Sequence, residues 1–113
     1  MYEYRAELVR VIDGDTIVVN MDLGLDVWVH DVHLRLRNID APEVRTRDAE
    51  EKERGLASKQ YLENVLAGHR HLVVATYKDK TSFNRYVADV MAGEVNVCPE
   101  MVRAGHASWS LKL

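Results

Sequence analysis

The stretch from Arg35 to Glu43 carries the side chains best suited to chemistry on a phosphodiester. Its sequence is Arg-Leu-Arg-Asn-Ile-Asp-Ala-Pro-Glu. The run from Arg35 to Ile39 is predicted to be strand, with Arg35 and Arg37 on one face and Asp40 where the strand ends. Pro42 fixes its own φ and keeps the preceding residue out of the helical region, so Glu43 is held at a defined offset from Asp40. A carboxylate for a hard cation, a carboxylate for a water and a guanidinium for an anion are the parts of a metal-assisted phosphodiesterase. Taken alone, the stretch also fits an ordinary acidic turn at a strand end.

A second acidic cluster lies earlier in the chain, where Asp13 and Asp15 flank Gly14 between two β-branched apolar runs. One interpretation is a two-residue hairpin turn, for which Asp-Gly is the strongest short signal. The other interpretation starts from Asp15, which leads directly into an apolar run and would be buried at the start of a strand. A buried aspartate needs a partner such as a metal or an arginine. Because a hairpin around residues 22–26 would join this strand to the next, Asp15 is expected to lie beside Asp40.

Four short motifs follow one another along the chain. They are Ile12-Asp-Gly-Asp-Thr16, the stretch from Arg35 to Asp40-Ala-Pro-Glu43, the basic loop Lys80-Thr-Ser-Phe-Asn-Arg85, and Met101-Val-Arg-Ala-Gly-His-Ala107. Each motif is weak alone, but four in this order and at these spacings form a specific signal. With them the chain resembles the staphylococcal-nuclease-like (thermonuclease) family, from about Tyr4 to about Trp109.

Hydrophobic periodicity and turn residues predict strands, one long helix and one short helix. The third strand is long and is expected to bend or bulge near His30-Asp31. Gly55 is a mild defect in the first turns of the long helix, and Gly68 stops it. Pro99 suits the first position of the short helix, which ends at Gly105. The predicted strands are residues 4–10, 12–21, 27–39, 71–77 and 85–91, and the helices are residues 51–66 and 98–105.

Length and composition fit a single domain over residues 1–113. The 113 residues are 47% hydrophobic, enough for one core but not for two. Periodicity alone indicates a β-rich α+β fold. The resemblance implies a five-stranded Greek-key barrel of the OB-fold type with one long and one short helix, lacking the family's long C-terminal helix. The lone Cys98 excludes an internal disulfide. No secretory signal or membrane-length apolar run is seen, so a cytoplasmic protein without membrane contact is expected.

The resemblance implies a metal site at the two acidic clusters. Asp15 and Asp40 are expected to bind Ca²⁺ through carboxylate oxygens, and Ala41 through its backbone carbonyl. The family often has threonine at residue 41, and a main-chain ligand tolerates alanine. Asp13 is expected to orient the turn or ordered waters from outside the ligand shell. Oxygen ligands also suit Mn²⁺ and Mg²⁺, so the choice of Ca²⁺ comes from the resemblance alone.

The resemblance also implies the chemistry. Glu43 is expected to act as general base or to position the attacking water, while Arg35 and Arg85 hold the non-bridging phosphate oxygens. Lys80 and Phe83 are expected to contact the nucleic acid, with the Phe83 ring stacking on a base. Members of the family usually cut both DNA and RNA with little sequence preference and leave 3′-phosphates. The net charge of −3 predicts weak, salt-sensitive substrate binding.

A second class of function fits the same fold, namely a non-catalytic module that binds nucleic acid or protein. A module without activity is expected to have lost at least one critical position. All five are retained here: Asp15, Arg35, Asp40, Glu43 and Arg85. An apolar patch around Trp109, Leu111 and Leu113 could be covered by a partner or a second copy, which leaves a monomer or a weak homodimer open. Arg37 is expected to be an exposed strand residue, and the five histidines lack a zinc-ligand spacing.

Overall fold

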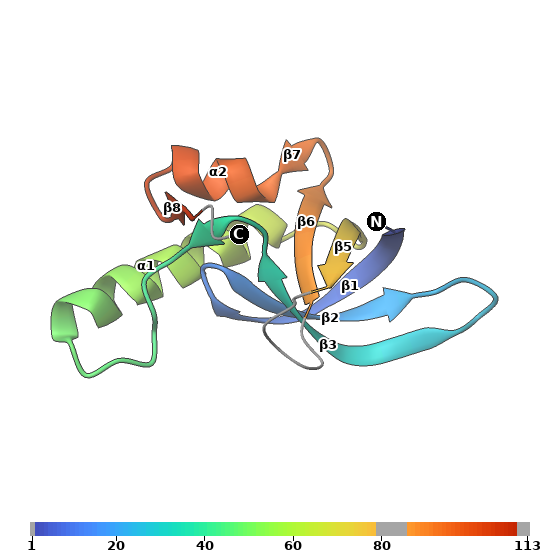
Figure 1. Cartoon of the computed structure of the whole chain (residues 1–113), viewed down its shortest axis with the longest axis horizontal. Coiled ribbons are helices and arrows are strands. Elements are labelled where there is room, and N and C mark those ends of the chain that lie inside the picture. Colours follow the sequence, from blue (N-terminus) through green and yellow to red (C-terminus); the bar gives the residue numbers. More distant parts are fainter. Residues whose placement is uncertain (1, 79–85, 111–113) are drawn as a thin grey trace.

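The computed structural model describes residues 2–78 and 86–110 and contains a β-barrel with two helices packed on it (Figure 1). The longer strands are β1 (Tyr2–Asp13), β2 (Thr16–Asp22), β3 (Trp28–Leu36), β5 (Leu72–Lys78) and β6 (Tyr86–Ala92). The helices are α1 (Ala49–Leu66) and α2 (Val97–Arg103). The two-residue strands are β4 (Ile39–Asp40), β7 (Val95–Asn96) and β8 (Ser108–Trp109).

A pairing between strands far apart in the sequence closes the barrel. Hydrogen-bonded neighbours follow the order β3-β2-β1-β5-β6, all antiparallel. Residues 34–36 of β3 then pair in parallel with residues 86–88 of β6. α1 packs against β1, and α2 packs against β6 and α1. The predicted β-rich barrel of five strands with one long and one short helix is confirmed. The described residues that follow α2, up to Ser110, contain β8 and no third helix.

Alternate residues of the strands fill the interior of the barrel. Leu34 and Leu36 of β3 are almost fully buried, whereas Arg35 between them is not, as the two-residue period of a strand requires. Leu62 and Leu66, one turn apart on α1, are buried with them. Each large aliphatic side chain buried in this way contributes about 1.5–3 kcal/mol. The largest buried side chains include Ile17, Leu34, Leu36, Ile39, Leu62, Leu72 and Met101.

β3 is shorter than the sequence predicts. The expected unbroken strand up to Ile39 is wrong at Arg37 and Asn38, which form a turn between β3 and β4. Asn38 has a φ of 62°, in the left-handed region that asparagine tolerates better than most residues. Arg37 forms an ion pair of 3.3 Å with Asp89, and its guanidinium carbon lies 4.1 Å from the ring centroid of Tyr77. Arg37 therefore has structural partners on β5 and β6.

The helix ends and the strand bend agree with the sequence to within a few residues. α1 begins at Ala49 because the Asp48 side chain accepts hydrogen bonds from two backbone N–H groups of the first turn. The bend expected at residues 30–31 is present, since Asp31 has a φ of 57° and the β2–β3 register shifts nearby. Pro99 is the third residue of α2, not the first. The first N–H groups of any helix lack an intrahelical partner, so this position also tolerates proline. Neither helix in the described part of the chain has both the length and the apolar composition to cross a bilayer.

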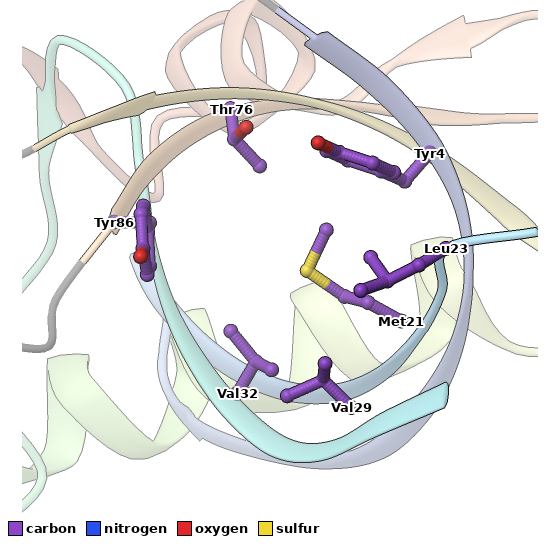
Figure 2. Close-up of a pocket in the computed structure, with 7 residues that line it drawn as sticks. All are labelled: Tyr4, Met21, Leu23, Val29, Val32, Thr76 and Tyr86. Atoms are coloured by element: carbon purple, nitrogen blue, oxygen red, sulfur yellow. The ribbon is translucent and has the colours of Figure 1, made fainter. Parts of the chain in front are cut away.

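One mouth of the barrel is open and mainly apolar (Figure 2). A cavity of about 240 Å³ lies there, and Tyr4, Thr76 and Tyr86 contribute hydroxyl groups to its lining. Leu23 and Val29 are also part of the lining and are partly exposed to solvent. No described Asp or Glu lines this cavity, so it is separate from the two acidic clusters.

Candidate active site

The turn between β1 and β2 presents two aspartates. Asp13 pairs with Thr16 across the hairpin, so Gly14 and Asp15 form its two-residue loop. Asp15 is only 6% exposed. Its Oδ1 accepts a hydrogen bond from the Thr16 hydroxyl at 2.9 Å, and its Oδ2 accepts one from the Ala41 backbone N–H at 2.9 Å. Both interpretations of the Asp-Gly-Asp sequence are therefore correct. The segment is a tight hairpin turn, and its second aspartate is buried with hydrogen-bond partners.

Arg35 joins the two acidic clusters. It lies opposite Thr16 in the β2–β3 pairing. Its Nη2 lies 3.5 Å from Asp15 Oδ2 and donates a hydrogen bond to Asp40 Oδ1. The same nitrogen contacts the carbonyl oxygen of Ile39 at 3.4 Å. Asp15 and Asp40 are thus close enough to share one guanidinium, which leaves a local excess of one negative charge.

Hydrogen bonds to the β1–β2 turn hold the segment that carries Glu43. The Ala41 N–H donates to Asp15 at 2.9 Å, and the Val44 N–H donates to Asp13 Oδ1 at 3.0 Å. Glu43 lies between these bonds and is exposed to solvent. Within the described residues its carboxylate has no hydrogen bond or ion pair. An exposed carboxylate on a restrained backbone is suited to holding a water molecule.

Gly55 on α1 and Gly14 in the β1–β2 turn allow other segments and the helix to approach each other closely. A Cβ atom added at Gly55 would lie 2.4 Å from the carbonyl oxygen of Glu43 and 2.9 Å from the nitrogen of Val44. A Cβ atom added at Gly14 would lie 2.8 Å from the Cβ of Ser58. The interpretation of Gly55 as a helix defect is therefore incomplete, because the approach of another segment requires glycine there. No local pattern in the sequence predicts that approach.

A short strand from late in the chain pairs with the strand that carries Asp40. In the β4–β8 pair, Asp40 lies opposite Ser108 and Ile39 lies opposite Trp109. This pairing is not among the strands predicted from the sequence. Its only sequence signal is the fourth motif, which ends just before β8 and gives no indication of the partner strand.

A polar network joins α1 to α2 and to the chain leading into β8. Ser58 Oγ donates a hydrogen bond of 2.7 Å to the carbonyl oxygen of His106, and the rings of Tyr61 and His106 stack at 4.7 Å. The Tyr61 hydroxyl donates to Glu100, and Arg103 Nε donates to Glu100 Oε1 at 2.8 Å. These hydrogen bonds from Arg103 and Tyr61 lower the pKa of Glu100 to about 2.

The oxygen donors near Arg35 fit a hard divalent cation in their chemistry. Asp15 and Asp40 supply carboxylates that contact one nitrogen, and the carbonyl of Ala41 follows Asp40 directly in the chain. Over residues 2–78 and 86–110, no three His, Cys, Asp or Glu side chains are grouped to hold a metal ion. A site at this place would therefore combine two carboxylates with main-chain and solvent oxygens, which suit Ca²⁺, Mg²⁺ and Mn²⁺.

Some predicted residues lie outside the described part of the chain. They are Lys80, Phe83 and Arg85 of the predicted site, and Leu111 and Leu113 of the predicted apolar patch. Trp109 of that patch is described and is 53% exposed. β6 begins at Tyr86, and its next residue, Val87, pairs with Arg35. β6 therefore runs directly beside the strand that carries Arg35.

Comparison with known proteins agrees with this geometry. The family described as staphylococcal nuclease homologue matches residues 33–112, and the chain belongs to this family. The matched range includes Arg35, Asp40 and Glu43.

Three curated relatives from Escherichia coli are similar to the chain. Over 108 residues it is 36% identical to proteins described as "Uncharacterized endonuclease" from Escherichia coli O157:H7 and from Escherichia coli. These alignments cover 95% of this chain and 61% of each relative, so the chain spans about three fifths of their length. Over 68 residues it is 40% identical to "Protein ParB" of Escherichia coli, covering 60% of this chain and 35% of that protein.

Proposed function

We propose that this chain is a metal-dependent nuclease that hydrolyses phosphodiester bonds of DNA and RNA. The observation that carries the proposal is the convergence of Asp15, Arg35 and Asp40, with Glu43 on a restrained segment beside them. Membership of the family and the endonuclease descriptions of two relatives support this class of reaction. A purely structural ion pair would account for Arg35 and Asp40. It would leave the exposed carboxylate of Glu43, which has no partner in the described residues, without a role.

The proposed cofactor is Ca²⁺, held by the carboxylates of Asp15 and Asp40 and the carbonyl oxygen of Ala41. When bound, the cation supplies positive charge that polarises the phosphate and offsets the local excess of negative charge. Asp13 supports this arrangement through its hydrogen bond to the Val44 backbone. A mixture of carboxylate and main-chain oxygens from separate segments suits the large, flexible shell of Ca²⁺ better than the strict octahedron of Mg²⁺.

Glu43 and the arginines perform the proposed hydrolysis. Glu43 accepts a proton from a water molecule, or orients that water, for attack at phosphorus opposite the 5′-oxygen. The bond from phosphorus to the 5′-oxygen breaks, that oxygen takes up a proton, and the product keeps a 3′-phosphate. Only Nη2 of Arg35 is engaged in the described contacts, so its other N–H groups are available to the non-bridging oxygens. Arg85 is proposed as the second phosphate ligand, and Lys80 and Phe83 as contacts to the flanking nucleotides.

The test compares the purified protein with a Glu43→Gln variant on end-labelled single-stranded DNA and RNA, in Ca²⁺, in Mg²⁺ and in chelator. A general base contributes about 100- to 10,000-fold to the rate, so cleavage by Glu43→Gln is expected to fall by that factor. Glu63→Gln is the matched control because Glu63 is exposed on α1 and the chemical change is identical.

The end groups and the metal requirement decide between the two classes of function. Ca²⁺-dependent cleavage with 3′-phosphate ends in the wild type and Glu63→Gln, but not in Glu43→Gln, supports the nuclease. A folded wild type that binds DNA and cuts it under none of the metals is the non-catalytic module instead.

A further inference from the structure

The backbone of Glu43 lies against α1 at Gly55. A Cβ atom at Gly55 would lie 2.4 Å from the carbonyl oxygen of Glu43, 2.6 Å from its carbonyl carbon and 2.9 Å from the nitrogen of Val44. All three distances are shorter than real Cβ contacts. The obstructing atoms belong to the backbone, so no rotation of a side chain relieves the overlap. A side chain at residue 55 fits only if the Glu43 segment moves away from the helix.

Helix formation does not explain glycine at residue 55. Gly55 lies in the interior of α1 (Ala49–Leu66) and is not among the glycines with positive φ. In a helix interior glycine is less favourable than alanine because it loses more backbone entropy on folding. The close approach of Glu43 is the feature of this structure that requires it.

The peptide group between Glu43 and Val44 is restrained from two sides, because its carbonyl group lies against Gly55 and its N–H donates to Asp13. The N–H groups of Ala41 and Val44 donate to the two aspartates of the β1–β2 turn at 2.9 and 3.0 Å. The second of these bonds comes from the same peptide group that packs against α1 at Gly55. Two hydrogen bonds from one element and one steric contact from another therefore determine where the Glu43 Cα lies.

We propose that Gly55 is a positioning residue for Glu43: the missing side chain sets the depth at which the Glu43 backbone docks on α1. The effect on hydrolysis rests on the proposed function, whereas the effect on position does not. Restoring ordinary contacts around a methyl group would move the Glu43 backbone by roughly 1 Å, and a displacement of that size at a catalytic group costs on the order of 100-fold in rate.

The test uses Gly55→Ala, with Leu56→Ala as the control. Leu56 is the neighbouring residue on α1 and is 48% exposed, so its replacement changes a side chain of the helix while Gly55, which forms the close contact with Glu43, is kept. The first readout is the Val44 amide in two-dimensional ¹⁵N NMR spectra. The second is the nuclease assay, resolved into kcat and KM. The third is the affinity for Ca²⁺ measured by calorimetry.

A positioning role predicts a specific combination of changes. In Gly55→Ala the Val44 amide signal shifts and exchanges faster with solvent, and kcat falls on the order of 100-fold. KM and the Ca²⁺ affinity stay within about threefold of wild type, because the substrate and metal ligands are intact. Leu56→Ala changes none of these. A general loss of structure would instead lower kcat and the Ca²⁺ affinity and raise KM.

Each other outcome also decides the question. An unchanged Val44 amide signal and an unchanged kcat in Gly55→Ala overturn the proposal. An equal fall of kcat in Gly55→Ala and Leu56→Ala also overturns it. If Gly55→Ala does not fold, a nuclear Overhauser effect between a Gly55 Hα and the Val44 N–H in the wild type supports the docking, and its absence overturns it. If the wild type cuts no nucleic acid, the nuclease proposal fails while the Val44 amide still tests Gly55.

Discussion

Replacing Asp15 by asparagine isolates the charge of the buried carboxylate. The amide oxygen can still accept from the Ala41 N–H, and the amide nitrogen can donate to the Thr16 hydroxyl, so both hydrogen bonds persist in neutral form. A hydrogen bond to a charged group contributes about 1.5–3 kcal/mol and a neutral one about 0.5–1.5 kcal/mol. The partly exposed ion pair with Arg35, at 3.5 Å, adds about 0–1 kcal/mol. Each of the two hydrogen bonds therefore weakens by about 1–1.5 kcal/mol. With the ion pair, the free energy of unfolding without metal is expected to fall by about 2–4 kcal/mol.

The effect of calcium on stability tests whether Asp15 is a ligand. At a Ca²⁺ concentration 100 times the dissociation constant, the free energy of unfolding of the wild type rises by about 2.7 kcal/mol. If loss of the carboxylate weakens binding tenfold, the gain of Asp15→Asn at the same concentration falls to about 1.4 kcal/mol. A larger loss of affinity brings the gain closer to zero.

Urea unfolding followed by tryptophan fluorescence measures both quantities, since Trp28 and Trp109 lie on β3 and β8. Unchanged m-values would show that the denatured state is comparable between variants. Asp26→Asn is the matched control, because Asp26 is exposed in the β2–β3 connection and makes the same change in net charge. If Asp15→Asn gains as much from Ca²⁺ as the wild type and Asp26→Asn do, Asp15 is not a metal ligand and the proposed donor set is wrong.

Two further predictions concern the network between the helices. Ser58→Ala removes the 2.7 Å hydrogen bond to the His106 carbonyl and is expected to lower the free energy of unfolding by about 1–2 kcal/mol. The fluorescence emission of Trp109 is expected to shift as β8 loosens. An unaltered urea midpoint would contradict this prediction. The pKa of Glu100 is lowered from 4.5 to about 2 by hydrogen bonds from Arg103 and Tyr61, so its stabilising effect is complete above pH 4.5 and is lost as pH falls toward 2. The difference in urea midpoint between wild type and Glu100→Gln should shrink over that pH window, and a difference that stays constant through it would show that Glu100 is not the titrating group.

The sequence predicts the barrel strands well because their information is local. The two-residue alternation that buries Leu34 and Leu36 is readable without a structure, and the Asp-Gly pair marks the β1–β2 turn. The approach of Asp15 to Asp40 also follows, since one hairpin joins β2, which begins directly after Asp15, to β3, which ends at Leu36 shortly before Asp40. The closed barrel itself came from the family resemblance, because the parallel β3–β6 pairing has no local signal.

The parts that the sequence does not predict depend on long-range packing. In the sequence Gly55 is only a residue that destabilises α1, whereas in the structure the Glu43 backbone packs against it. The turn at Asn38 interrupts a run predicted as one strand, although asparagine itself favours turns. The pairing of β4 with β8 involves two residues on each side, too few for a periodic pattern. In each case the deciding interaction comes from a segment distant in sequence.

The β4–β8 pairing also sets the order in which the region around Asp40 can be completed. Asp40 and its partner Ser108 are far apart in the sequence. The β1–β2 hairpin, in contrast, closes between neighbouring residues such as Asp13 and Thr16. Distant pairings form late because a long loop must be closed first, and during synthesis the N-terminal part is available first. A nascent chain therefore carries Asp13, Asp15 and Asp40 before it has the strand that fixes Asp40 in place. Under the proposed function, the strand that pairs with Asp40 is therefore added to the candidate site after its carboxylates have been synthesised.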